Sequence, residues 1–319
     1  MNTDHSSLTI RFRGVRGSIP SPGKDTARYG GNTSCIELRC QGHLLILDAG
    51  SGIRELGNDL ARECDGQPVR GDLLISHTHW DHIQGFPFFS PAYTPGNRVR
   101  IFTVKGLTSN LESALRGQMQ WTHFPVTLNR MEGICGFEEL PARDARVGPY
   151  SINSTALNHP GGCAGFRINT EHGSLAYLPD HEPFGASSNG PSIDAREAAL
   201  IEFIRGVDLL ILDTQYTEVE YVNRVGWGHG CLRDSVALAE EAQVGQLAFF
   251  HHDPCHHDDF IDQMVQTGHY LNGSNDLKIW AAAEMQTVTM KRKSVPPDSG
   301  LTVGRISKVT LTSQPVKIA

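Results

Sequence analysis

Six consecutive residues form the densest group of chemically useful side chains in this sequence. The segment 77–82 reads H-x-H-x-D-H and contributes His77, His79, Asp81 and His82. Imidazole nitrogens suit zinc and other borderline divalent metals, and a carboxylate adds charge that can hold a second cation. Four ligands in one loop exceed what one catalytic metal with an open position needs. The motif therefore predicts a site for two metal ions.

Three later segments supply the further ligands that two metals require. His159 lies in NHPGG, Asp180 lies in YLPDHE, and His251 and His252 lie together in FFHHDP. The two adjacent histidines are alternatives for one position. We favour His251, because it directly follows an apolar run.

The same residues share a second property, which is their place at the end of an apolar run. Such runs lead directly into Asp48, His77, Asp180, Asp213 and His251. One polar residue at a strand end is usually a turn or cap residue. Five of them indicate that one edge of a sheet forms a site, because sites in open α/β sheets gather at the carboxyl ends of strands.

The elements that must position these side chains alternate between strands and helices. Short apolar runs bounded by turn residues predict strands at 8–13, 34–39, 43–48, 72–76, 99–104, 174–178, 208–213, 246–251 and 277–282. Capping residues and helical spacing predict helices at 108–119 (N-cap Thr108 or Ser109), 193–205 (beginning near Asp194) and 232–244. His256, His257, Asp258 and Asp259 are interpreted as the polar start of another helix. This alternation predicts a layered α/β protein.

Length and charge narrow the domain organisation and the partners. The chain has 319 residues and a net charge of −7, of which residues 291–319 contribute +5, so residues 1–290 carry about −12. We expect one domain at 1–290 and a linker with a C-terminal tail at 291–319. The tail adds an edge strand or binds a second subunit. An acidic body argues against long nucleic acid as a partner, because proteins that bind long nucleic acid usually present a basic surface.

In this order, the motifs resemble the metallo-β-lactamase fold hydrolases over about residues 8–290. The resemblance implies a single-domain α/β fold, a four-layer αββα sandwich with a dinuclear metal site between its two sheets. It implies that one metal is bound by His77, His79 and His159, that the second is bound by Asp81, His82 and His251, and that Asp180 bridges them. An aspartate bridge, in place of the cysteine of some antibiotic-degrading members, argues against a β-lactamase. Zinc is favoured by ligand type, with manganese or iron as alternatives; Cys163 and Cys255 match no ligand position.

Other motifs resemble one branch of that family. GVRGSIPSPG (14–23) and YGGNTSC (29–35) are similar to the opening of the RNase Z-like phosphodiesterases. DLLILDTQY (208–216) and GWGHG (226–230) are similar to that branch's acid–histidine pair, which implies that Asp213 orients His229 and that His229 protonates the leaving oxygen. Asp213 is one methylene shorter than the glutamate often found there. The implied nucleophile is a metal-bridging hydroxide held by Asp180 and Asp81.

The resemblance favours a small substrate. RNase Z carries a long arm between the positions of His159 and Asp180, and here only 20 residues separate them. We therefore expect an enzyme, a dinuclear metal-dependent phosphodiesterase acting on a small phosphodiester, with a 3',5'-cyclic nucleotide as the leading candidate. Six aromatic residues either wall a base-stacking pocket or pack in the core: Phe86, Phe88, Phe89, Tyr93, Trp121 and Phe124. Alternatives are an RNase Z-like tRNA 3'-end endonuclease, a lactonase or thioesterase, and a non-catalytic nucleotide sensor.

Location and assembly are the remaining expectations. The N-terminus has no apolar segment of the kind that directs secretion, and no apolar run approaches the roughly 18 residues that span a bilayer. Seven cysteines without a regular framework fit reduced thiols. We expect a cytoplasmic protein with no membrane partner, and analogy with the branch suggests a homodimer.

Overall fold

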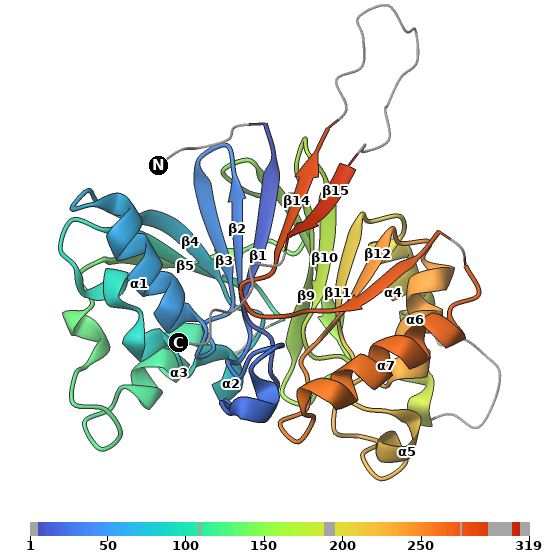
Figure 1. The fold of residues 1–319 in the computed structure, drawn as a ribbon. Coiled ribbons are helices and arrows are strands. Elements are labelled where there is room, and N and C mark those ends of the chain that lie inside the picture. Colours follow the sequence, from blue (N-terminus) through green and yellow to red (C-terminus); the bar gives the residue numbers. More distant parts are fainter. Residues whose placement is uncertain (1–5, 108–109, 188–194, 275, 293–307, 313–319) are drawn as a thin grey trace, which may run out of the picture.

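Two β-sheets packed face to face make up the centre of the molecule (Figure 1). The computed structural model describes residues 6–107, 110–187, 195–274, 276–292 and 308–312. Among these residues the first sheet has the strand order β15-β14-β1-β2-β3-β4-β5-β6 and the second has the order β13-β12-β11-β10-β9-β8-β7. The first sheet contains β1 (Leu8–Gly14), β2 (Cys35–Cys40), β3 (His43–Leu47), β4 (Arg70–Leu74), β5 (Arg98–Val104), β6 (Ile134–Leu140), β14 (Thr287–Lys291) and β15 (Lys308–Thr312). The second contains β7 (Ala145–Val147), β8 (Tyr150–Leu157), β9 (Cys163–Asn169), β10 (Ser174–Leu178), β11 (Leu209–Asp213), β12 (Gln246–Phe250) and β13 (Lys278–Ala281).

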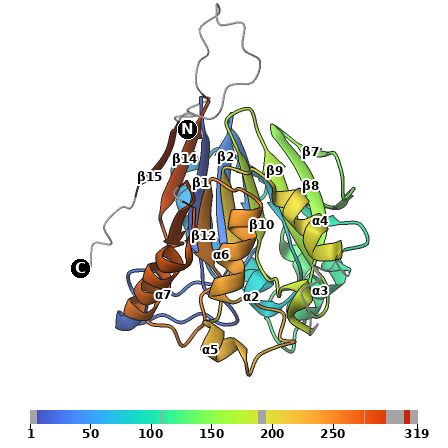
Figure 2. The ribbon, with the colours of Figure 1, turned by 90° about the vertical axis from the view of Figure 1, so that its right-hand side faces the viewer.

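Helices cover the outer face of each sheet. On the first sheet lie α1 (Ile53–Cys64) and α3 (Leu111–Gln118), with the short α2 (Trp80–Ile83) at one edge. On the second lie α4 (Ala195–Ile204), α6 (Leu232–Glu241) and α7 (Asp258–Leu271), which face the viewer in Figure 2. The short α5 (Glu218–Tyr221) lies at the lower edge. The expected αββα sandwich is therefore confirmed.

Three apolar layers hold the sandwich together, because each sheet has two apolar faces. The layer between the sheets includes Phe12 and Leu38 from the first sheet and Phe166 and Phe250 from the second, all fully buried. The outer layers pack α1 and α3 on the first sheet, and α4, α6 and α7 on the second. Strands buried on both faces read as unbroken apolar runs, which is why β3, β11 and β12 are so apolar.

The C-terminal part of the chain joins the first sheet. β14 pairs antiparallel with β1, and β15 pairs antiparallel with β14, so residues 308–312 form the edge strand. The division expected after residue 290 falls inside β14. Of the expected N-caps, Thr108, Ser109 and Asp194 lie outside the described residues, and α3 is capped by Asn110, whose side chain accepts the Ser113 backbone N–H. In the described part of the chain, every helix is too short or too polar to cross a membrane.

Candidate dinuclear metal centre

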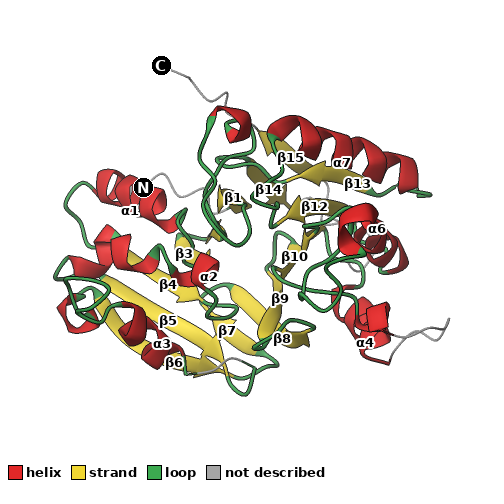
Figure 3. Cartoon of the chain, turned by 90° about the horizontal axis from the view of Figure 1, so that it is seen from below, coloured by secondary structure: helices red, strands yellow, loops and turns green. Residues whose placement is uncertain are grey.

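The carboxyl ends of several strands meet at one edge of the sandwich. β3, β4 and β5 are parallel neighbours in the first sheet, and β10, β11, β12 and β13 are parallel neighbours in the second. Figure 3 looks onto this edge, where α2 and the loops after the strands gather. Two strand-end residues, Asp48 after β3 and His251 after β12, have left-handed backbones with φ of 59° and 60°. Strained conformations of this kind cluster at functional sites.

The first ligand group joins three imidazoles and one carboxylate oxygen. It consists of His77, His79, His159 and Asp180, whose ligand atoms all lie within 4.8 Å of one another. Nε2 of His159 lies 2.9 Å from Nδ1 of His79. Oδ2 of Asp180 lies 3.6 Å from Nε2 of His77 and 3.5 Å from Nε2 of His159.

The second ligand group uses the other oxygen of the same aspartate. It consists of Asp81, His82, Asp180 and His251, all buried. Oδ1 of Asp180 lies 3.0 Å from Nε2 of His82 and 3.4 Å from Nε2 of His251. Oδ2 of Asp81 lies 3.0 Å from Nε2 of His251. The two oxygens of Asp180 thus face two different groups, which is the geometry of a bridging ligand.

Outer hydrogen bonds determine which nitrogen of each imidazole faces the centre. Nδ1 of His82 donates to Oδ2 of Asp48 at 2.9 Å, and Nδ1 of His159 donates to the carbonyl oxygen of Gly228 at 2.9 Å. Nδ1 of His251 donates to Oε1 of Gln215 at 3.2 Å. In the neutral form of each ring, Nε2 is therefore a lone-pair acceptor directed into the centre, as in metal-ligating histidines generally.

A buried cluster of acceptors of this kind fits cations. Among the described residues, Nε2 of His77 and Oδ1 of Asp180 are buried with no hydrogen-bond partner of suitable geometry. Buried polar atoms without a partner are costly, so native proteins satisfy them with hydrogen bonds, ordered water or ions. Five imidazoles and two carboxylates, one of them shared between the groups, are a donor set that suits two divalent metals. The side chains present therefore fit a dinuclear centre.

The electrostatic environment favours the metal-binding protonation states of His77, His159 and Asp180. Burial lowers the pKa of His77 well below its usual range, and burial also lowers the pKa of His159. Burial alone would raise the pKa of Asp180, but His251, His82 and His77 outweigh it and hold that pKa well below its usual range. Neutral imidazoles and an ionised carboxylate are the forms that bind metal. At His82, burial alone would lower the pKa, but the carboxylates of Asp180, Asp81 and Asp48 raise it well above its usual range, so a metal must displace a proton there.

The structure separates His251 from His252. Nε2 of His252 donates to the carbonyl oxygen of Ala282 at 2.8 Å, and the ring lies outside both ligand groups. Burial lowers the pKa of His252 to about 3. His252 is thus a neutral structural side chain, whereas His251 faces Asp81 and Asp180.

Asp213 and His229 form a hydrogen-bonded pair beside the ligand groups. Nδ1 of His229 donates to Oδ2 of Asp213 at 2.8 Å, so the shorter aspartate does reach the histidine. Burial alone would lower the pKa of His229, but the charge and hydrogen bond of Asp213 raise it to about 9. The ring of His229 stacks on that of His251 with centroids 5.0 Å apart and lies 5.1 Å from the ring of His159. At neutral pH this imidazole is therefore protonated, and it lies beside both ligand groups.

Several residues of the site had no assigned role in the sequence. Asp48 ends an apolar run, but its position alone does not show that it binds His82. The backbone N–H of Ser18 donates to Oδ2 of Asp81 at 2.8 Å, and Ser18 itself has a φ of 63°. Gln215 lies two residues after Asp213, and its backbone N–H donates to Oδ1 of Asp213. The contacts of Asp48 with His82, of Ser18 with Asp81 and of Gln215 with His251 join residues far apart in the sequence, so they leave no spacing pattern.

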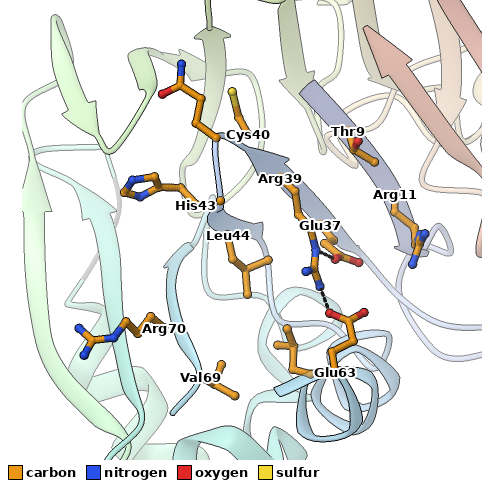
Figure 4. Close-up of a pocket in the computed structure, with 13 residues that line it drawn as sticks. Thr9, Arg11, Glu37, Arg39, Cys40, His43, Leu44, Glu63, Val69 and Arg70 are labelled. Carbon is orange, nitrogen blue, oxygen red and sulfur yellow. Dashed lines mark hydrogen bonds and ion pairs between the residues drawn. The ribbon is translucent and has the colours of Figure 1, made fainter. Parts of the chain in front are cut away.

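A separate cavity of about 380 Å³ lies away from this edge (Figure 4). It is lined by the turn between β2 and β3 together with parts of β1, β4 and α1. Its Arg39 is already paired with the carboxylates of Glu37 and Glu63. No residue of the two ligand groups lines it, so this cavity is distinct from the metal centre.

Comparisons with known proteins agree with this geometry. The sequence profile of the β-lactamase superfamily domain matches residues 43–252, which include both ligand groups. Ribonuclease Z from Thermoplasma acidophilum is 24% identical over 287 residues, covering 78% of this chain and 87% of that protein.

Two solved structures share the fold. The metallo-β-lactamase fold protein YhfI from Bacillus subtilis has a TM-score of 0.64 at 17% identity, over 89% of this chain and 99% of its own. A diphosphatase from the PhnP family has a TM-score of 0.62 at 17% identity, over 88% of this chain and 96% of its own. The chain belongs to the β-lactamase superfamily and is a metallo-β-lactamase fold hydrolase of the RNase Z-like branch.

Proposed function

We propose that this protein is a dinuclear metal-dependent phosphodiesterase that hydrolyses a small phosphodiester, with a 3',5'-cyclic nucleotide as the leading substrate. The observation that carries the proposal is the Asp213–His229 pair beside a centre that holds seven ligand side chains. Hydrolysis of a phosphodiester releases an alcohol, which is a poor leaving group unless a proton reaches its oxygen. A thioesterase has less need of such a donor, because a thiolate leaves more readily than an alkoxide.

The ligand residues have defined tasks in this proposal. One divalent cation would be held by His77, His79 and His159. A second would be held by Asp81, His82 and His251, and Asp180 would bind both cations. Bound there, two such cations supply Lewis-acid chemistry, which activates water near neutral pH and offsets the charge on phosphate oxygens. Zinc suits the imidazole-rich set, and manganese or iron suits its carboxylates.

The remaining steps belong to the chain's own side chains. Asp81 and Asp180 are ionised acceptors that would orient the attacking water through its hydrogens, and the proton that this water loses would pass to solvent. His229, held by Asp213, donates its proton to the leaving oxygen on the opposite side of phosphorus. Asp213 then stabilises the position of the neutral ring until it is protonated again. In-line attack with a positioned proton donor is the usual demand of phosphoryl transfer.

Two observations favour a small substrate over tRNA. Residues 160–179 are all described, and they are taken up by β9, β10 and short turns, which leaves no room for a projecting arm. The body of the chain is acidic, which disfavours a long polyanion. The ribonuclease Z relative keeps tRNA 3'-end cleavage as the second candidate.

Only some of the six aromatic residues considered for a base-stacking pocket are exposed. Phe86 and Phe89 are fully buried in the layer beneath α1, so they belong to the core. Phe88 is 56% exposed and Trp121 is 77% exposed, and the ring of Phe88 meets that of Phe124 edge-on at 5.4 Å. We propose that these exposed rings stack a nucleobase, since stacking contributes about 1–3 kcal/mol per base.

One experiment tests the reaction and the substrate together. Hydrolysis of 3',5'-cyclic AMP and of bis(p-nitrophenyl) phosphate is measured side by side, after loading with zinc or with manganese. Turnover of both that is abolished in His79→Ala supports the full proposal. Turnover of the nitrophenyl ester alone retains the chemistry and rejects the cyclic nucleotide. No turnover of either by metal-loaded protein rejects the phosphodiesterase.

A further inference from the structure

Glu182 is a buried carboxylate whose partners are neutral groups. It is 4% exposed, and its Oε1 accepts the hydroxyl of Tyr221 at 2.6 Å and the backbone N–H of Gly226 at 2.7 Å. Its Oε2 accepts the backbone N–H of Gly228 at 2.9 Å. Among the described residues, no arginine, lysine or histidine is within ion-pair distance of it. These three donors form an anion-binding cradle, and the anion that occupies it is the side chain of Glu182.

The cradle fixes a backbone segment that touches the metal centre. Gly228 has a φ of 87°, and a Cβ there would lie 2.5 Å from Nδ1 of His159 and 2.3 Å from Cδ of Pro160. Only glycine allows so close an approach. The carbonyl oxygen of Gly228 accepts Nδ1–H of His159 at 2.9 Å. Glu182 thus holds one side of Gly228, while His159 is oriented by the other.

The same cradle bears on the proton donor. His229 directly follows Gly228, and the backbone N–H of His181, next to Glu182, donates to Oδ2 of Asp213 at 3.1 Å. That oxygen also accepts Nδ1–H of His229. Three consecutive residues thus serve the site. Asp180 belongs to both ligand groups, His181 contacts Asp213, and Glu182 holds the backbone of Gly228, which precedes His229.

We propose that Glu182 is a positioning residue that sets the rings of His159 and His229 relative to each other through Gly228. Its carboxylate holds the 226–228 backbone against the loop that carries His159. In this position the ring of His159 would face the metal and the ring of His229 would face the leaving oxygen. The part of this inference that concerns turnover rests on the proposed phosphodiesterase function. The part that concerns His159 rests on the metal centre alone.

The test compares Glu182→Gln with Glu220→Gln in the full chain loaded with cobalt(II). The glutamine at 182 keeps the shape but presents its NH₂ group to one of the two backbone N–H donors. Glu220 is the matched control, because it caps the same segment through Thr217 and pairs with His256 without touching residues 226–228. We expect Glu182→Gln to change the cobalt(II) absorption spectrum. We also expect it to lower the affinity for one of the two cobalt ions about 10–100-fold, the usual effect of removing a hydrogen-bond partner of a metal ligand. We expect kcat to fall by a similar factor with KM little changed.

The outcomes separate the two proposals. An altered spectrum in Glu182→Gln alone supports positioning even if neither the parent nor the variant hydrolyses a phosphodiester, which would reject the proposed function only. An unchanged spectrum and unchanged kcat reject the positioning role. Equal changes in Glu182→Gln and Glu220→Gln also reject it, because both would then reflect general loosening of the segment. If Glu182→Gln fails to fold, Tyr221→Phe removes one donor from the same carboxylate, and it must shift the spectrum in the same direction by less, or the role is rejected.

Discussion

Nδ1 of His82 lies 2.9 Å from Oδ2 of Asp48, while Nε2 of the same ring lies 3.0 Å from Oδ1 of Asp180. Asp48 also accepts the Ser76 hydroxyl and the Tyr177 hydroxyl, each at 2.8 Å, so the carboxylate is immobile and fully buried. A carboxylate behind an imidazole sets the ring orientation and makes the other nitrogen a better ligand.

Asp48→Asn should therefore weaken metal binding at the second ligand group without removing a ligand. We expect its affinity to fall about 10–100-fold, because the amide cannot reproduce the charge behind His82. Competition with a chromogenic chelator measures both affinities. Asp72→Asn, which affects a buried strand aspartate paired with Arg100, is the control and should leave both unchanged. Equal affinity in Asp48→Asn and the parent protein would show that Asp48 serves folding only.

Asp81→Ala should lose one of two metals. Oδ2 of Asp81 lies 3.0 Å from Nε2 of His251 and 3.4 Å from Nε2 of His82, and Asp81 belongs to the second ligand group and not to the first. Elemental analysis should fall from two metals per chain to one. Two metals retained in the variant would remove Asp81 from the ligand set.

His229→Ala should keep both metals and lose turnover. The ring is held by Asp213 and stacks on His251, so we assign it proton donation and no ligand role. We expect kcat for an alkyl leaving group to fall about 10²–10⁴-fold, the usual size of general acid catalysis. Bis(p-nitrophenyl) phosphate is the internal control, because nitrophenolate leaves without a proton and should be hydrolysed nearly as before. A metal content below that of the parent would instead make His229 a ligand.

Sequence patterns predicted the strands at the centre of the fold better than its margins. All nine predicted strands are present, because each places apolar residues between turn residues. β11 and β12 are buried throughout, whereas β1 and β13 alternate buried positions with exposed or partly exposed ones. β6, β7, β8, β9 and β14 were missed. In β8 (YSINSTAL) the polar residues Ser151, Asn153, Ser154 and Thr155 are only partly buried, so its sequence does not read as an apolar run. α1 was missed although Ile53, Leu56 and Leu60 have helical spacing, because it follows Gly52 and has no capping side chain.

The candidate site shows the same division between side-chain types and tertiary contacts. The structure brings together all seven side chains that the motifs selected, because parallel strands place their carboxyl ends at one edge. Glu182 was not foreseen, since its partners are mostly backbone N–H groups and any residue type can supply those. Only the two glycines at 226 and 228 gave a signal, and glycines alone do not identify the group that they approach.

Phe86→Ala and Phe88→Ala should separate the core from the proposed base-stacking surface. Phe86 is fully buried, so its truncation should lower the free energy of unfolding by about 3–5 kcal/mol. Phe88 is 56% exposed, so its truncation should cost less than about 1 kcal/mol and should raise KM for a nucleotide substrate. Denaturant titration and steady-state kinetics on both variants provide the readouts. An unchanged KM in Phe88→Ala would exclude this ring from the substrate site.

Glu37 should make the stability of the fold depend on pH on the acid side. Nε of Arg13 donates to Oε2 of Glu37 at 2.8 Å, and both residues are buried. Burial alone would raise the pKa of Glu37, but Arg13 and Arg39 outweigh it and lower that pKa below its ordinary value of 4.5. A carboxyl group whose pKa is lower in the folded state stabilises fully above the unfolded value and loses this contribution as pH falls below it.

Glu37→Gln should therefore be less stable than the parent at pH 7, by about 3 kcal/mol, because Arg13 is left with Asp59 alone. The gap should narrow by about 1 kcal/mol between pH 7 and pH 4, since the parent loses its advantage as the carboxyl is protonated in the unfolded chain. Guanidinium titrations of both proteins at the two pH values measure the gap, and the contributions of the metal ligands cancel in the difference. Glu63→Gln, which removes a half-exposed partner of Arg39, should change stability by less than about 1 kcal/mol at either pH. A gap that stays constant or widens toward pH 4 would mean that Glu37 is not the ionised partner of Arg13.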